Sequence, residues 1–350
     1  MAEGAKYHLT GTTSKPMNVP VFDTPISIRE NFRRMCTNDK PLWVPNSMTD
    51  FNYAMGGELT GLSDIRFTFG PDPVDWVDLF GCIWEWEPAA GGSMLKPGGK
   101  PVLEDITDWE TDIVWPSLDE ERIRKCCELY QSQPYYQPSK LNYYDFGQGC
   151  TERLVAILGG YVEGMCALLE EPEACRDFMM ELTRFHIKLF DLVNKYLPTD
   201  MIMYHDDWGT ERDTFFSENV MEELVFEPTK IFFDHVKSQG TAICFHSCGN
   251  NKRFIPYMVE LNPEYLQMQL RCNDLVSFKE KYGDDIGFDV TYHTNVREVM
   301  EAESHEYLNE LGQNGRFFRT IFGSNEEVTW DATEELYNYS REFYDRKYSS

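Results

Sequence analysis

The sequence lacks an apolar run long enough to cross a membrane. A transmembrane helix needs about 18 or more consecutive, mostly apolar residues, and no such stretch occurs. Residues 1–20 also lack the basic start and following apolar run that mark a secretory signal. We therefore expect a cytoplasmic protein.

Positive charge is scarce in this chain. Lys and Arg number 32 against 59 Asp and Glu, which gives a formal net charge of -27. Such a charge repels phosphate backbones and anionic lipid headgroups. We expect neither nucleic acid nor membrane as a partner.

The cysteines are not arranged as in a disulfide-stapled domain. Ten of them are scattered through 350 residues at no repeating interval, and none follows Cys272. Small secreted domains instead carry dense cysteines as a disulfide framework. We expect most of these thiols to be reduced and buried as small apolar side chains.

The chain also lacks a Gly/Ser linker or an abrupt change of charge that would divide it. From residue 141 onward, short apolar runs alternate with longer amphipathic stretches, a pattern typical of strand–helix units on a parallel sheet. Each predicted strand is followed by its predicted helix or helices: strand 141–147 by helices 151–169 and 171–196, strand 201–206 by helix 219–238, strand 241–246 by helix 252–261, strand 265–270 by helix 274–282, strand 286–292 by helix 296–311, and strand 316–322 by helix 332–344.

Two further strand candidates, 41–45 and 76–86, bring the number of units to about eight, enough to close a barrel. The pattern predicts a single (β/α)8 TIM barrel over residues 26–350, preceded by an irregular N-terminal arm over 1–25. The segment 56–116 is rich in Trp, Gly, Pro and Asp, and we expect it to form a cap insertion.

Barrels of this class perform chemistry at the carboxyl ends of their strands. There, the apolar run 241–245 leads into His246 and Cys248. Alternate residues of a strand point to the same side, so an imidazole and a thiolate two residues apart can converge on one metal ion. The preceding strand ends in His205 and tandem aspartates; only one of these can point inward, and we predict that it is Asp207.

The order of several motifs resembles the uroporphyrinogen decarboxylase superfamily, which includes cobalamin-dependent methyltransferases on the same barrel. The resemblance runs from about residue 41 to the C-terminus. Its strongest parts are Tyr204–Thr210 (YHDDWGT), Phe226–Pro228 (FEP) and Phe245–Asn250 (FHSCGN), with weaker support from Asp274, from Lys279–Asp284 and from Asp75–Trp86.

The methyltransferase branch is more similar to this chain than the decarboxylases are. Tetrapyrrole decarboxylases hold a substrate with many carboxylates by means of an arginine-rich N-terminal segment. The corresponding region here offers only Arg29, Arg33 and Arg34, followed by a stretch without basic residues. A neutral aromatic ligand suits such a pocket better.

In the zinc methyltransferases of this family, the His-X-Cys pair and a distant downstream cysteine hold the metal. This chain has no such cysteine, and residues 322–327 read FGSNEE. The resemblance thus implies a zinc site of His246, Cys248 and Glu326, because zinc accepts carboxylate oxygen. Fewer thiolates make the metal a stronger Lewis acid, which favours methyl donation from oxygen.

We predict a methyltransferase that moves a methyl group from an aryl methyl ether, of the veratrole or guaiacol type, to the cob(I)amide of a separate corrinoid protein. The chain carries no Asp-X-His-X-X-Gly cobalamin signature, so the cobalamin would be held by that partner. The predicted catalytic residues are His205, Asp207 and His246. The predicted substrate-binding residues are Phe51, Trp84, Tyr144, Trp208, Tyr292 and His293.

Three other functions remain open. A zinc-dependent methylcorrinoid:thiol methyltransferase would use the same His-X-Cys pair. A lyase similar to uroporphyrinogen decarboxylase would need basic groups around the substrate, and a scaffold for a cobalamin protein would need neither metal nor turnover. A homodimer is compatible with each of these.

Overall fold

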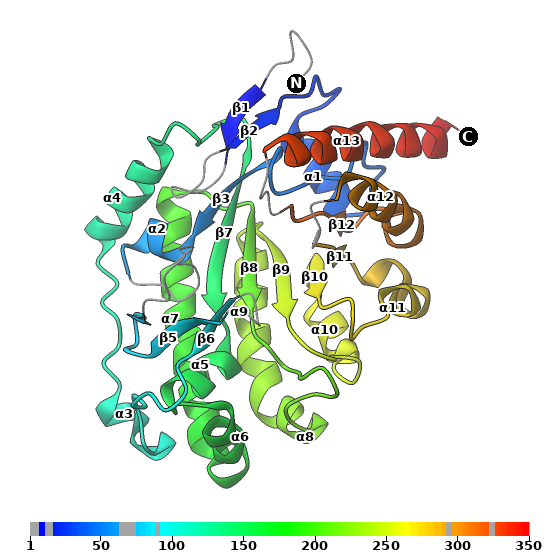
Figure 1. Cartoon of the computed structure of the whole chain (residues 1–350). Coiled ribbons are helices and arrows are strands. Elements are labelled where there is room, and N and C mark those ends of the chain that lie inside the picture. Colours follow the sequence, from blue (N-terminus) through cyan, green and yellow to red (C-terminus); the bar gives the residue numbers. More distant parts are fainter. Residues whose placement is uncertain are drawn as a thin grey trace.

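The computed structural model describes residues 7–10, 17–62, 75–87, 92–291, 296–321 and 326–349. Within them, seven parallel strands form one curled sheet in the order β12-β11-β10-β9-β8-β7-β3, with helices packed around it (Figure 1). The strands are β3 (Phe51–Met55), β7 (Leu141–Gln148), β8 (Met201–His205), β9 (Ala242–Ser247), β10 (Tyr265–Met268), β11 (Phe288–Asp289) and β12 (Phe317–Phe318). The predicted α/β fold of the TIM-barrel type is confirmed.

The helices follow the strands in alternation, as the sequence predicts. They are α1 (Ile28–Cys36), α2 (Gly56–Thr60), α3 (Trp109–Asp112), α4 (Glu120–Gln131), α5 (Cys150–Ile157), α6 (Tyr161–Glu170), α7 (Pro172–Tyr196), α8 (Glu218–Val220), α9 (Phe226–Ser238), α10 (Ile255–Leu261), α11 (Leu275–Tyr282), α12 (Arg297–Leu311) and α13 (Glu326–Ser349), with 3-10 turns η1 (Ile106–Asp108) and η3 (Gly283–Asp285) and a π-helical turn η2 (Met221–Val225). Among these described helices, none is both long and apolar enough to cross a membrane.

The curled sheet closes through a single bridge in place of a full eighth strand. Asn46 pairs in parallel with Arg319, just after β12, and the Ser47 amide donates to the Arg319 carbonyl at 3.2 Å. The predicted strand 41–45 is therefore wrong in its bounds: the bridge is centred on Asn46, and within 41–45 it involves Pro45, whose carbonyl accepts from the Arg319 amide at 3.2 Å. The Phe51 and Phe318 rings, 5.5 Å apart, meet across the same gap.

The first barrel strand is β3, which the sequence pattern missed. The predicted barrel strand 76–86 instead forms a hairpin of β4 (Trp76–Val77) and β5 (Ile83–Glu87), joined by β6 (Gly92–Leu95) in a separate antiparallel sheet. Gly81, at φ +91°, supplies the turn between β4 and β5. We call this three-stranded sheet the side sheet.

Two other departures concern chain boundaries. The stretch predicted as one helix over 151–169 is two helices, because Gly159 at φ +86° breaks it between α5 and α6. In the predicted irregular arm, β1 (Tyr7–Thr10) and β2 (Met17–Pro20) pair antiparallel.

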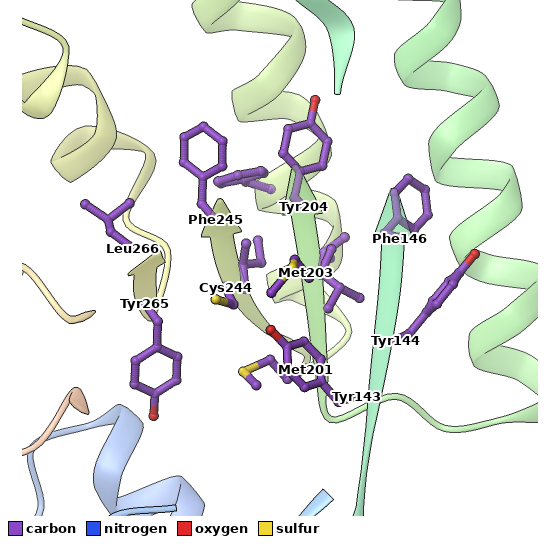
Figure 2. Packing of buried hydrophobic residues seen from close by; sticks show 14 of the residues in the cluster. Tyr143, Tyr144, Phe146, Met201, Met203, Tyr204, Cys244, Phe245, Tyr265 and Leu266 are labelled. Carbon is purple, nitrogen blue, oxygen red and sulfur yellow. The ribbon is translucent and has the colours of Figure 1, made fainter. Parts of the chain in front are cut away.

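Aromatic rings fill the amino-terminal part of the barrel interior. Phe51 lies 5.7 Å from Tyr143, and Tyr265 lies 5.6 Å from Phe318, measured between ring centroids. Figure 2 shows Tyr143 and Tyr265 on the opposite side of the strands from Tyr204 and Phe245. The interior is thus packed at this end, and the polar side chains lie at the other.

His186 of α7 is a buried titratable group in this packing. Its ring lies 5.2 Å from Phe146 of β7, and burial, together with the charge of Arg153, lowers its pKa from 6.5 to about 3. Its Nδ1 atom is buried without a hydrogen-bond partner among the described residues.

We predict that His186 weakens the fold in acid. Because its pKa is depressed on folding, the unfolded chain takes up the proton first, so stability is lost as the pH falls below 6.5 toward 3. At pH 5 the loss is about 2 kcal/mol. Urea unfolding at pH 7 and pH 5 should therefore show a smaller pH effect in His186→Phe than in the wild type. An equal pH effect in both proteins would contradict this assignment.

Candidate functional site

The carboxyl ends of β8 and β9 bring three metal-capable side chains together. Ligand atoms of His205, Asp207 and His246 all lie within 4.8 Å of one another. His205 and His246 are neighbours in the ladder between the two strands, and their rings stack at 4.1 Å with an interplanar angle of 13°.

Cys248 joins the same group. Its Sγ lies 3.2 Å from His246 Nε2, and its backbone amide donates to Asp207 Oδ1 at 2.7 Å. The same Asp207 oxygen lies 3.7 Å from His246 Nε2. We call His205, Asp207, His246 and Cys248 the β8–β9 cluster. Four of the residues singled out in the sequence thus meet at one place.

His246 is oriented by a chain of buried polar groups. Gln267 Nε2 donates to Asp289 Oδ2 at 2.6 Å, so the Gln267 amide oxygen faces His246 Nδ1 at 2.7 Å. Since that oxygen only accepts, Nδ1 carries the proton and Nε2 keeps its lone pair toward Cys248. Burial raises the pKa of Asp289, and hydrogen bonds from Thr320 and Gln267 lower it.

His205 is held by a residue that the sequence did not indicate. Its Nδ1 lies 2.7 Å from Glu152 Oε2, and both side chains are nearly buried. Glu152 belongs to the first turn of α5, which is far from the β8 motif in sequence. An acidic residue in a first helical turn is common, and only the tertiary fold brings this one to His205.

Asp206 faces away from the cluster and fixes α5 in place. Its carboxylate accepts hydrogen bonds from the Glu152 amide at 2.8 Å, from the Trp208 indole at 3.0 Å and from the amide and hydroxyl of Thr151. A Cβ on Gly149 would lie 2.5 Å from Asp206 Cβ, so this close approach requires glycine. Burial raises the pKa of Asp206 to about 7, against the lowering effect of its donors.

The loops after β8 and β9 touch through their backbones. Gly249 has φ +80°, and a Cβ there would lie 2.1 Å from the Gly209 carbonyl oxygen. The Gly249 amide donates to Gln269 Oε1 at 3.1 Å, and Gln269 Nε2 lies 3.4 Å from Cys248 Sγ. The glycine behind the His-X-Cys pair is therefore needed for the turn that presents the thiol.

Two aromatic rings lie near the cluster. Tyr161, the first residue of α6, stacks on Phe215 of the loop after β8 at 4.6 Å and 24°. Burial raises the pKa of Tyr161, and the negative charges of Glu152 and Asp207 raise it further. Its phenol therefore stays protonated. Neither ring was expected from the sequence, because neither belongs to a motif.

The structure does not bring four predicted substrate-binding rings to this cluster. Phe51 belongs to the packed aromatic layer described above. Trp84 lies in the side sheet, where its indole donates to Asp78 Oδ2 at 2.9 Å. Tyr144 is on the outer face of β7, next to Phe146 (Figure 2). Trp208 is fully buried against Phe245, and its indole holds Asp206.

The remaining predicted site residues are Tyr292, His293 and Glu326. Tyr292 and His293 lie outside the described residues. Glu326 is the first residue of α13 and is exposed, and it is not part of the metal-capable group. Its role as a third zinc ligand remains a prediction.

Comparisons with known proteins point to the fold. No family model matches the chain, and no curated protein does. Among solved structures, a methyltransferase from Methanosarcina mazei is similar with a TM-score of 0.55, at 15% identity over 82% of each chain. An endo-1,4-beta-xylanase from Caldicellulosiruptor owensensis aligns with a TM-score of only 0.29, at 9% identity over 61% of this chain and 74% of that one. At 15% identity, the likeness to the methyltransferase is one of fold alone.

We predict that Asp206→Asn destabilises the protein strongly at pH 8, where the wild-type carboxylate is ionised. The amide group that replaces one oxygen cannot accept, so buried donors of α5 and Trp208 lose their partner, at about 1–3 kcal/mol each. Urea unfolding should show a loss of about 2–4 kcal/mol. Asp119→Asn is the matched control, because Asp119 caps α4 at an exposed site and asparagine caps equally well. Equal effects of the two substitutions would contradict the anchoring role.

Proposed function

We propose that this protein is the substrate-side methyltransferase of an O-demethylation system. It would move a methyl group from an aryl methyl ether to the cob(I)amide of a separate corrinoid protein. The observation that carries this proposal is the β8–β9 cluster, with nitrogen, sulfur and oxygen donors gathered at the carboxyl ends of the strands. The fold shared with a methyltransferase from Methanosarcina mazei supports it.

The donor types of the cluster fit zinc. Zinc binds imidazole nitrogen, thiolate sulfur and carboxylate oxygen, and ligating histidines usually donate their other N–H to an acceptor. His246 meets that condition through Gln267, and Cys248 Sγ and Asp207 Oδ1 surround its Nε2. We infer that His246, Cys248 and Asp207 would hold the metal. When bound, it would act as a Lewis acid on the ether oxygen.

A residue of the chain can also supply the proton that the reaction requires. In the transfer, the methyl–oxygen bond breaks, a methyl–cobalt bond forms, and the phenolate oxygen that leaves must gain a proton. Phenolate is a poor leaving group, so a positioned donor lowers the barrier. His205, with Glu152 at 2.7 Å, is placed to hold that proton beside the cluster.

A flat apolar substrate suits the remaining surroundings. Tyr161 and Phe215 offer a stacked aromatic surface, and the Tyr161 hydroxyl adds a neutral donor. The cluster lies at the strand ends, on the side of the barrel where a second protein can present its cofactor. We infer that the corrinoid is delivered there by the partner.

The two rival enzymatic functions are less favoured by the site. Thiol activation by zinc relies on a sulfur-rich ligand set, and Cys248 is the one thiol in the β8–β9 cluster. A polycarboxylate substrate needs basic groups, yet Arg29, Arg33 and Arg34 belong to α1 and pair with Asp200, Glu30 and Asp39. In or near the loops of the cluster, Arg253 pairs with Asp213 and Arg271 pairs with Glu211.

We expect turnover of veratrole or guaiacol when reduced corrinoid protein is the acceptor. The measurement follows the absorbance of methylcobalamin and the release of the demethylated phenol. We expect methyl transfer to a thiol and decarboxylation of uroporphyrinogen to be absent. Activity in either of those two assays, without ether demethylation, would replace the proposal by the corresponding rival.

Zinc affinity should identify the third ligand. We expect His246→Ala and Asp207→Asn each to weaken zinc binding by about 100-fold or more, since ligand loss exceeds the effect of outer-shell changes. Glu326→Gln is the matched control, and we expect it to bind zinc as the wild type does. Competition titration with a chelator and elemental analysis report this without any turnover. A loss in Glu326→Gln with none in Asp207→Asn would restore the ligand set predicted from the sequence.

A further inference from the structure

The barrel interior is less tightly filled toward the carboxyl ends of its strands. Along β8, the inward-facing side chains of Met201 and Met203 are 0% and 6% exposed, and His205, the next on this face, is partly exposed. The trend is the same along β3, where Phe51 is fully buried and Tyr53, two residues later on the same face, is partly exposed. Solvent therefore reaches the interior from the level of Tyr53 up to the β8–β9 cluster.

Asp145 of β7 lies in this part of the interior. It follows Tyr143 by two residues and so points to the same inner face, and it is the ladder neighbour of Met203. Asp145 is only 4% exposed. The Tyr53 hydroxyl donates to Asp145 Oδ2 at 2.5 Å. The other oxygen, Oδ1, is buried and has no hydrogen-bond partner among the described residues.

The side chains next to Asp145 on β8 and β9 do not supply the missing donor. Met203 has no donor group, and the thiol of Cys244, which pairs with Met203 in the ladder, donates to Asp289 Oδ2 at 3.6 Å. A buried acceptor without a donor is costly, and the cost is larger when the group carries charge. A bound molecule that brings a hydroxyl group to Oδ1 would remove that cost.

A single aromatic ring can connect Asp145 with the cluster. Asp145 is level with Met203, and His205 lies two residues further along the same face of β8, which corresponds to about 7 Å along the strand. A ring whose hydroxyl meets Asp145 can therefore place a methoxyl group beside the cluster. That methoxyl group would face the end of the barrel at which we expect the corrinoid to arrive.

We propose that Asp145 is a specificity-determining residue that selects methoxyphenols, which carry a free hydroxyl group in addition to the methyl ether. The substrate hydroxyl would donate to Asp145 Oδ1, and the ether oxygen would lie at the β8–β9 cluster. This inference rests on the proposed function, which does not specify whether the arene carries such a hydroxyl. A fully methylated arene offers only acceptor oxygens, so it would leave the buried carboxylate oxygen without a donor. Guaiacol is therefore preferred to veratrole.

The test is a calorimetric titration of the zinc-loaded full chain with guaiacol and, as the matched probe, veratrole, without corrinoid protein. Guaiacol should bind about 10- to 100-fold more tightly, because it gains one hydrogen bond to a charged acceptor. Asp145→Asn keeps the shape of the side chain but removes its charge, so the preference should fall to about threefold or less. Veratrole should bind this variant as it binds the wild type, which also reports that the variant is folded.

Methionine labelled at its methyl group locates the bound arene. Nuclear Overhauser effects should join the guaiacol ring protons to the Met203 methyl group, and Met203→Leu assigns that signal. Equal affinity for guaiacol and veratrole in the wild type, as expected if water alone occupies Asp145 Oδ1, would overturn the proposal. So would an unchanged preference in Asp145→Asn, or guaiacol binding without contact to Met203. These three outcomes leave the proposed function intact, whereas binding of neither arene would contradict both.

Discussion

The site depends on one buried carboxylate that never faces it. The Asp206 carboxylate accepts hydrogen bonds from two amides at the start of α5, from the Thr151 hydroxyl and from the Trp208 indole. These bonds hold α5 against the end of β8. Because side chains alternate along a strand, the outward turn of Asp206 directs His205 and Asp207 inward. The same hydrogen bonds position Glu152 beside His205. Without this anchor, the two histidines would stay neighbours in the ladder, but Glu152 would no longer be held beside His205.

Buried polar side chains form hydrogen bonds to both histidines of the cluster. His246 Nδ1 donates a hydrogen bond to Gln267, and Gln267 donates one to Asp289. The Asp289 carboxylate also accepts hydrogen bonds from the Thr320 amide and hydroxyl. His205 Nδ1 contacts a carboxylate directly, that of Glu152. The two stacked imidazoles therefore differ in what supports them, an amide in one case and an anion in the other. That difference gives them separate roles in the proposed chemistry: His246 binds the metal and His205 holds a proton.

Much of this site could be predicted from the sequence, and the part that could not has a physical cause. His246 with Cys248, and Asp207 in preference to Asp206, follow from alternation along short strands, a local property. Glu152 and Tyr161 could not be found in this way, because only the tertiary fold brings α5 and α6 near the ends of β8 and β9. The fold class was predictable from the repeated strand–helix pattern. The 76–86 hairpin was misassigned because its apolar residues form a run like that of a barrel strand, and β3 was missed although it is as long as β8. Phe51, Trp84, Tyr144 and Trp208 lie away from the cluster because composition identifies aromatic residues but does not indicate where each ring packs.

The contact between Gly209 and Gly249, with the hydrogen bond from the Asn250 amide to the Thr210 carbonyl, joins the loops after β8 and β9 into one unit. The first loop carries Phe215, and the second carries Cys248. A change of shape in either loop must be matched by the other, because their backbones leave no room between them. A change of ligand preference on this scaffold would therefore require both loops to be replaced together, and not substitutions in one loop alone.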